Sequence, residues 1–171
     1  AVQDGVDVNT RAEAAAGEVP RERWLRHVAK EGLVETVRAL AAAGAVVDLA
    51  DNHGCTALYA AAIHGHVEAT RALLAAGAEV DHADNLGYTA LDAAAQDGHV
   101  EAMRALLEAG AEVDHANNNG CTALTAAAFH GHVEAVRALG APRSDTHGQQ
   151  GTGMARAAAA GDGASHRHDA G

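Results

Sequence analysis

The sequence repeats itself with a 33-residue period. Three residue types keep this period: glycines (Gly54, Gly87, Gly120 and Gly32, Gly65, Gly98, Gly131), threonines (Thr56, Thr89, Thr122) and leucines (Leu40, Leu73, Leu106, Leu139). A period of about 20–50 residues indicates one supersecondary unit that is copied and stacked on its neighbours. Such an array offers a long surface and rarely a closed pocket, so the sequence favours a binding protein over an enzyme.

The first half of one unit reads as a turn followed by a short helix. Residues 51–54 are Asp-Asn-His-Gly, which are turn formers because they tolerate left-handed or side-chain-bonded backbone. The Thr56 hydroxyl can accept one of the free N–H groups of a first helical turn. We therefore predict a helix over Ala57–Ile63, which Gly65 ends because glycine adopts positive φ without strain.

The second half of the unit reads as a second helix. Val67, Leu73 and Leu74 suit one face of a helix over Val67–Ala75, and Gly77 is its predicted end. Glu68 and Arg71 lie three residues apart on the opposite face. The same spacing recurs in the other copies (Glu35/Arg38, Glu101/Arg104, Glu134/Arg137). We interpret these pairs as solvated charge on an outer surface, worth a few tenths of a kcal/mol each.

These residues resemble the ankyrin repeat. The family pattern of Gly, T-P-L-H, A-A, G-H, L-L and G-A appears in the three copies that start at Gly54, Gly87 and Gly120, with a degenerate copy before them. The resemblance implies an all-α solenoid of stacked helix-turn-helix units with hairpin-like turn tips. The expected segments are 1–17 (the end of an upstream repeat, suggested by Gly5 to Asn9, or a linker), 18–50, 51–83, 84–116, a truncated 117–139, and a low-complexity tail over 140–171 that we read as largely disordered.

The copies depart from the family pattern at two helical positions. Ala57, Ala90 and Ala123 replace the family's proline, and Tyr59, Asp92 and Thr125 replace its histidine. Asp92 should form a capping box with Thr89, because a carboxylate three residues on can reach back to the cap N–H. We expect Tyr59 and Thr125 to do this less well, with weaker hydrogen bonding between neighbouring repeats there.

The two ends of the array also depart from the pattern. The last copy loses its periodicity after Leu139, and Pro142 cannot continue a helix, so we predict a last helix about one turn short. In the tail, Met154 to Ala160 could form two helical turns that dock on the exposed end of the fourth repeat as a cap. At the other end, we expect Trp24 to pack as part of an N-terminal cap, with an exposed binding anchor as the alternative.

The charge of the chain excludes several kinds of partner. Its formal net charge is −11, and between Asp51 and Asp114 eleven acids face only two bases. This field repels phosphate, so we expect neither nucleic-acid nor anionic-membrane binding. No apolar run approaches the length of roughly 18 residues that a membrane span needs.

The two cysteines are not expected to form a disulfide. Cys55 and Cys121 lie two repeats apart, on the order of 20 Å, which is too far for the bond. Reduced thiols favour a cytoplasmic or nuclear setting.

Neither metal binding nor catalysis is predicted. Three H-x-H pairs exist (His64/His66, His130/His132, His166/His168), but His66, His99 and His132 hold the same repeat position, as do His82 and His115. Residues in phase lie one repeat apart and do not converge on one ion. Asp92, Asp97 and His99 lack a nucleophile, and the His53–Cys55 pair lacks an oxyanion hole. We therefore expect no enzyme activity, no cofactor, no metal and no small-molecule substrate.

The expected function is a protein-interaction scaffold. The resemblance implies that a partner is held by the turn tips and the exposed side of the first helix, on the concave face. The residues at those positions are Asn52, His53, Cys55, Ile63, His64, Asn85, Leu86, Tyr88, Gln96, Asp97, Asn118, Asn119, Cys121, Phe129 and His130. They vary more between copies than the frame around them, and the aromatics among Asn and His suit a binding surface.

We expect the groove to centre on Leu86, Tyr88 and Phe129, the partner to carry basic residues, and the chain to be a monomer. Two alternatives stay open. The array could be the regulatory or targeting arm of a larger enzyme or channel, or a degenerate repeat fragment.

Overall fold

The computed structural model describes residues 21–141; the expectations for Gly5 to Asn9 and for Met154 to Ala160 lie outside them. Within the described part the chain forms helices and no strand. The helices are α2 (Arg21–Lys30), α3 (Val34–Ala42), α4 (Ala57–Ile63), α5 (Val67–Ala75), α6 (Ala90–Gln96), α7 (Val100–Glu108), α8 (Ala123–Phe129) and α9 (Val133–Gly140).

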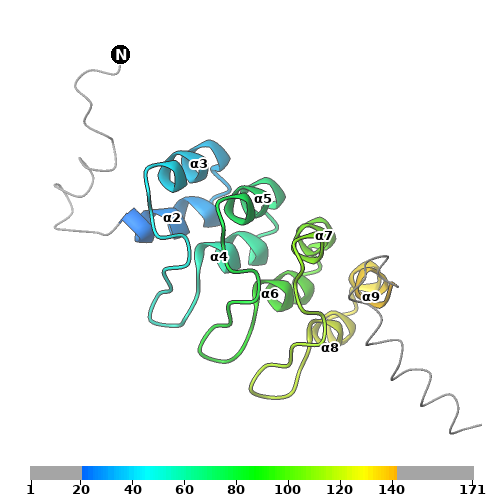
Figure 1. Cartoon of the computed structure of the whole chain (residues 1–171). Helices are drawn as coiled ribbons and strands as arrows, with labels where there is room; N and C mark the ends of the chain where they lie inside the picture. The colour runs from blue at the N-terminus through cyan, green and yellow to red at the C-terminus, as the bar shows by residue number, and fades with distance from the viewer. Residues whose placement is uncertain (1–20, 142–171) are drawn as a thin grey trace, which may run out of the picture. The chain divides into compact units, whose positions relative to one another are not determined.

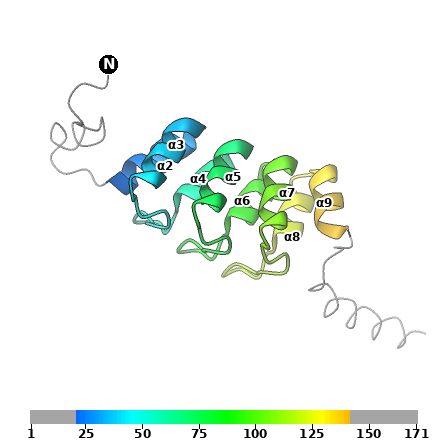
Figure 2. The same cartoon turned by 45° about the horizontal axis from the view of Figure 1, so that its top comes forward.

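The helices form two rows (Figures 1 and 2). In the inner row α2, α4, α6 and α8 pack side by side, and in the outer row α3, α5, α7 and α9 do the same. Each inner helix also packs on the outer helix that follows it, as α4 does on α5. The loops that join one unit to the next extend from the helices on a common side. The predicted all-α solenoid of helix-turn-helix units is confirmed.

The inner row packs closely because its buried side chains are small. Ala61, Ala62, Ala94 and Ala95 are fully buried between neighbouring helices. Alanine has no side-chain rotamers to lose and lets helices approach each other closely. Larger side chains fill the space between the rows, chiefly Leu25, Leu58, Leu73, Leu91, Met103 and Leu106, each no more than 1% exposed.

Threonine caps begin the inner helices as predicted. Thr56, Thr89 and Thr122 each accept a hydrogen bond from the backbone N–H three residues on. At Thr89 the box is complete, because Asp92 Oδ2 accepts from the Thr89 N–H at 2.8 Å.

The expectation for Thr125 is wrong. Its Oγ1 accepts from the Thr122 N–H at 2.8 Å and closes a second capping box. A threonine hydroxyl can serve as an acceptor here, just as a carboxylate does. No capping box is formed at Tyr59, in keeping with the prediction, since the structure gives only the bond from its N–H to Thr56.

The last outer helix is longer than predicted. Helix α9 has 8 residues and runs through Gly140, whereas α3, α5 and α7 have 9 each. It is therefore one residue short, not about one turn. Gly140 keeps helical backbone, which costs only about 1 kcal/mol relative to alanine.

The outer charges pair as predicted in three of four units. The pairs within one helix are Arg38–Glu35 at 2.9 Å, Arg104–Glu101 at 3.4 Å and Arg137–Glu134 at 2.7 Å. In the fourth case Arg71 lies 3.7 Å from Glu108 of the next unit instead of beside Glu68, and it is still exposed on the outer face, as interpreted. This pair links α5 to α7, but both partners are exposed, so its contribution is small.

Trp24 packs against the hydrophobic core at the N-terminal end of the array, as expected for a cap. It is partly buried and meets His27 edge to face with ring centroids 5.9 Å apart. Its indole N–H is buried and has no hydrogen-bond partner in the described part. The alternative of a fully exposed binding anchor does not fit this position.

Two histidines bond their unit to the one before it. The imidazole Nε2 of His132 donates to the Gln96 carbonyl at 2.9 Å, and that of His66 donates to the Lys30 carbonyl at 2.8 Å. The His132 ring lies over Gly98 so closely that a Cβ there would stand 2.6 Å from it. Gly-His pairs such as Gly131–His132 therefore form the turn between the two helices of a unit and also join that unit to its neighbour.

We predict that Gly98→Ala destabilises the protein more than Gly131→Ala. Both glycines have left-handed φ (74° and 75°), so both substitutions carry the same backbone penalty of about 1–2 kcal/mol. Only the Cβ at position 98 meets an imidazole, because no atom of residues 21–141 lies within 4 Å of a Cβ built at position 131. Urea unfolding followed by circular dichroism measures the difference. Adding His132→Ala should shrink the excess cost of Gly98→Ala, and equal costs for the two single variants would refute the interlock.

Candidate functional site

Each turn tip is held by a side chain at its first residue. Asp84 Oδ1 accepts hydrogen bonds from the N–H groups of Leu86 and Tyr88, both at 2.9 Å. The Asp84 N–H also donates to the Tyr88 carbonyl at 2.9 Å. Asp51 and Asn117 make the same bonds to the residues two and four positions later. The tips are therefore fixed hairpin-like turns, as the resemblance implied.

A ladder of asparagines joins one tip to the next. The Asn85 side-chain amide donates to the Asn52 carbonyl at 2.8 Å, and that of Asn118 donates to the Asn85 carbonyl at 3.2 Å. The backbone N–H of Asn85 donates to the carbonyl of His53. These asparagines serve the scaffold, which the sequence interpretation missed. The signal was present, because Asn52, Asn85 and Asn118 keep the 33-residue period.

A second ladder runs along the loops after the outer helices. Asp48 Oδ1 accepts from the Glu79 N–H, and Asp81 Oδ1 accepts from the Glu112 N–H, both at 2.9 Å. The sequence analysis did not single these aspartates out. They keep the 33-residue period, which Asp114 continues, and this regularity could have identified them.

The structure places most of the proposed binding residues at the surface. Those exposed are Asn52, His53, His64, Asn85, Leu86, Asp97, Asn118, Asn119, Cys121, Phe129 and His130. The others, Cys55, Ile63, Tyr88 and Gln96, are half-buried. Two large apolar side chains stand out, since Leu86 is 61% exposed and Phe129 is 86% exposed.

The three residues at the predicted centre lie at opposite ends of the inner helices. Leu86 and Tyr88 belong to the tip before α6, whereas Phe129 is the last residue of α8. A seven-residue helix is about 10 Å long, and neighbouring helices are about 8–10 Å apart. The candidate surface is therefore a strip along the inner helices, with the tip residues at one end and Phe129 and His130 at the other.

Tyr59 belongs to this surface, although the sequence analysis treated it as part of the frame. It is half-buried on α4, and partial burial, then the charge of Asp84, raises the pKa of its phenol to about 12. Tyr88 of the next unit makes a smaller contribution to the same shift. Sequence reasoning could have found Tyr59 as an aromatic residue at a position where this family has histidine.

The first tip borders a hollow of about 460 Å³. Asn52 and His53 line it together with Arg23 and Arg26 of α2. Arg26 lies 3.7 Å from the Asp51 carboxylate. Partial burial would raise the pKa of Asp51, but the N–H groups of Cys55 and His53 and the charge of Arg26 outweigh it and lower that pKa. The N-terminal end of the surface is thus basic, unlike its middle.

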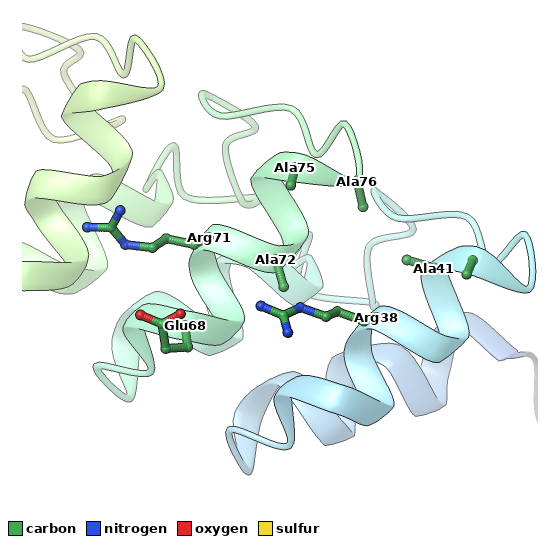
Figure 3. Close-up of a pocket in the computed structure, with 8 residues that line it drawn as sticks. Arg38, Ala41, Glu68, Arg71, Ala72, Ala75 and Ala76 are labelled. Carbon is green, nitrogen blue, oxygen red and sulfur yellow. The ribbon is translucent and has the colours of Figure 1, made fainter.

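A second hollow lies on the outer row, away from the tips (Figure 3). It is an open groove of about 630 Å³ between α3 and α5, floored by alanines such as Ala41 and Ala72. Arg38 extends across it from α3, whereas Arg71 points toward α7, where it meets Glu108. The groove has no converging polar groups beyond Arg38 and Glu68 at its edge, so we do not assign it a ligand.

The candidate chemical groups are Cys55 and the residue types that bind metals. Burial, then the nearby charges of Asp51 and Asp84, raises the pKa of the Cys55 thiol, which disfavours the reactive thiolate. Within residues 21–141 no group of three His, Cys, Asp or Glu side chains could hold a metal ion. In the same part of the chain, no helix has the length and apolar character needed to cross a bilayer.

A comparison with models of known protein families matches nearly the whole array. A family model described as ankyrin repeats (many copies) matches residues 25–74, 58–102 and 91–139. The three overlapping matches span α2 to α9 almost completely. No curated protein matches the sequence significantly.

We predict that Tyr59 makes the protein less stable at alkaline pH. Its pKa in the folded protein is about 12, against an ordinary value of 10.0. Above pH 10 the unfolded chain loses the phenolic proton while the folded chain keeps it, so stability falls between about pH 10 and pH 12. Denaturant unfolding at a series of pH values should show a shallower loss for Tyr59→Phe. Identical profiles for the two proteins would contradict the proposed burial.

Proposed function

Because this chain belongs to the ankyrin repeat family, whose units generally mediate protein–protein contacts, we propose that it is a scaffold that binds a protein partner. The binding surface is the strip along the inner helices and the turn tips. Its mechanism is rigid presentation: the tips and helices hold the contact residues in place before the partner arrives.

The observation that carries this proposal is the position of Leu86. It projects from a tip that is fixed by Asp84 and by the asparagine ladder, and it is 61% exposed. An exposed apolar side chain on a rigid frame loses little conformational freedom on binding, so more of its burial contributes to affinity. Tyr88, which is half-buried, follows two residues later in the same tip, and tyrosines are frequent energetic centres of interfaces.

The structure changes which residues we assign to the surface. The side chains of Asn85 and Asn118 are already bonded to the neighbouring tip, so they hold the frame instead of the partner. Tyr59 is added because it is partly exposed on α4 and the charge of Asp84 in the next tip acts on its phenol. The contact set that we favour is Leu86, Tyr88, Tyr59, Asn119, Phe129 and His130.

The charge of the surface favours a partner with basic residues over the middle units. Asp84 and Asp97 face solvent there at least in part, and the segment from Asp51 to Asp114 carries eleven acids and two bases. Over α2 the charge reverses, because Arg23 and Arg26 border the first hollow. A partner that lies along the strip should therefore place its basic side chains away from α2.

We further propose that the protein acts in a reducing compartment, the cytoplasm or the nucleus, and as a monomer. Cys55 and Cys121 are both free thiols in the structure. Free thiols on an accessible surface suit compartments in which thiols stay reduced.

We predict that Tyr88→Ala combined with Phe129→Ala abolishes partner capture. The purified protein is immobilised and incubated with lysate, and captured proteins are quantified by mass spectrometry. The matched control is Leu33→Ala, because Leu33 is a leucine that is 50% exposed at the start of α3, outside the strip. A specific partner is one that the natural chain and the control retain and the double variant loses. A partner set that is the same for all three would refute the surface, provided that circular dichroism shows intact helices.

We predict that the captured partner dissociates more readily as salt rises. Contacts between exposed acids and basic residues weaken once the screening length falls below the spacing of the charges, to about 3 Å at 1 M salt. Titrating the immobilised complex with sodium chloride measures the effect. Retention that stays unchanged over the whole titration would show that the partner is held by apolar contacts alone and that the charge argument is wrong.

A further inference from the structure

The first turn tip carries two hydrogen-bond donors of a kind that the later tips use to bind their neighbours. Asn85 and Asn118 each donate from the side-chain amide to the tip before them. Their backbone N–H groups also donate to that tip, to the His53 carbonyl at 2.9 Å and to the Leu86 carbonyl at 3.0 Å. Asn52 keeps the same repeat position and is exposed. Within residues 21–141, however, neither its N–H nor its side-chain amide donates to any group. The first tip therefore presents two donors that can serve two acceptor oxygens from outside.

These donors border the hollow of about 460 Å³ beside the first tip, and the lining of that hollow is net positive. It holds the guanidinium groups of Arg23 and Arg26 against a single carboxylate, that of Asp51. Asp51 is already bonded, because its Oδ1 accepts two backbone N–H groups of its own turn and its Oδ2 lies 3.7 Å from Arg26 Nε. Arg23 is exposed and belongs to no ion pair within the described residues. An incoming anion therefore meets a guanidinium group that no other carboxylate occupies.

Arg23 differs in this respect from the arginines of the outer helices. Those four arginines lie between 2.7 and 3.7 Å from a glutamate, in the pairs Arg38–Glu35, Arg71–Glu108, Arg104–Glu101 and Arg137–Glu134. Their charge is balanced within the outer row. Among these arginines and Arg26, Arg23 is therefore the one whose charge is left for an outside anion.

The hollow also has an apolar wall. Leu49 lines it together with Ala50, and Leu49 is 44% exposed. Covering this leucine with an apolar side chain removes apolar surface from water. The exclusion of water also lowers the local dielectric constant, which strengthens a neighbouring charge pair. The hollow therefore suits an acidic side chain that has an apolar residue next to it.

We propose that the hollow between α2 and the first tip binds the carboxylate of an acidic side chain of the protein partner, while an apolar neighbour of that side chain covers Leu49. The inference rests on the proposed function, because the acidic side chain belongs to the partner of the scaffold. The carboxylate oxygens accept hydrogen bonds from the Arg23 guanidinium and from the two donors of Asn52. A guanidinium group suits this role because its planar set of N–H donors matches the two oxygens of a carboxylate.

This pocket gives the partner a direction along the array. The middle units carry Asp84 and Asp97, which face solvent at least in part. Acidic groups of the partner are repelled there and attracted to the α2 end, and its basic groups experience the reverse. The partner therefore lies with an acidic segment over α2 and a basic segment over the middle units.

The test titrates the full chain, isotope-labelled for NMR, with two capped dipeptides, acetyl-Glu-Leu-amide and acetyl-Gln-Leu-amide. We expect the acidic dipeptide to shift the signals of the Asn52 backbone and side-chain amides, and the neutral one to bind about two- to fivefold more weakly. Arg23→Gln should weaken binding of the acidic dipeptide by a similar factor. Its matched control, Arg104→Gln, removes an exposed arginine of α7 and should leave that binding unchanged. Inorganic phosphate is titrated as a second anion.

Three results would overturn the proposal. Equal binding of the two dipeptides would show that the hollow does not recognise a carboxylate. An effect of Arg23→Gln no larger than that of Arg104→Gln would remove the arginine from the site. Shifts at Asn52 that inorganic phosphate produces at lower concentration than the acidic dipeptide would assign the hollow to phosphate instead. The titrations need no captured partner, so their failure is distinct from a failure of the scaffold, which the variant with Tyr88→Ala and Phe129→Ala tests.

Discussion

The array depends on contacts between units, because none of its helices can stand alone. The inner helices α4, α6 and α8 have 7 residues each, and isolated helices of fewer than about 12–15 residues are marginal in water. Their stability comes from alanine-lined packing and from three kinds of polar link, each of which is present at two of the three junctions between described units. The His132–Gln96 bond, the asparagine ladder and the Asp81–Glu112 bond each join one unit to its neighbour. Within the described residues the last unit has a neighbouring unit on one side only, which explains why Leu124 is exposed whereas Leu58 and Leu91 are buried.

Much of this fold could be predicted because the residues that start and end helices recur at the same position in every repeat. The bounds of α4 and α5 follow from Thr56, Gly65 and Gly77, since caps and glycines fix where helices begin and end. The predicted box at Thr89 formed for the stated reason. The box at Thr125 was not predicted, although a threonine hydroxyl can accept the cap N–H. The length of α9 was wrong because the helix continues through Gly140, although Pro142 follows two residues later. The arrangement of the inner and outer rows follows from the family resemblance more than from any single residue.

The candidate site was less predictable, because the role of each of its residues depends on contacts with the neighbouring unit, which the local sequence does not reveal. Nothing in the local sequence tells whether Asn85 faces a partner or the neighbouring tip, and only the period hints that it belongs to the frame. Arg71 shows the same limit, since its choice between Glu68 and Glu108 depends on the distance to α7. Tyr59 was missed because it occupies a position that holds a structural histidine in this family. A tyrosine, however, is a residue type that is common in interfaces.

The division between frame and surface also limits where binding can be changed without loss of the fold. Tyr88 and Leu86 follow Asp84, whose carboxylate binds the N–H groups of both residues and not their side chains. The side chains at these two positions can therefore vary while the turn keeps its shape. Asp92 and His132 have no such freedom, because the Asp92 side chain caps its own helix at Thr89 and the His132 side chain bonds to the preceding unit. An array built in this way can change its partner by substitutions at the tips, as long as the first residue of each tip and the asparagine that bridges to the preceding tip are kept.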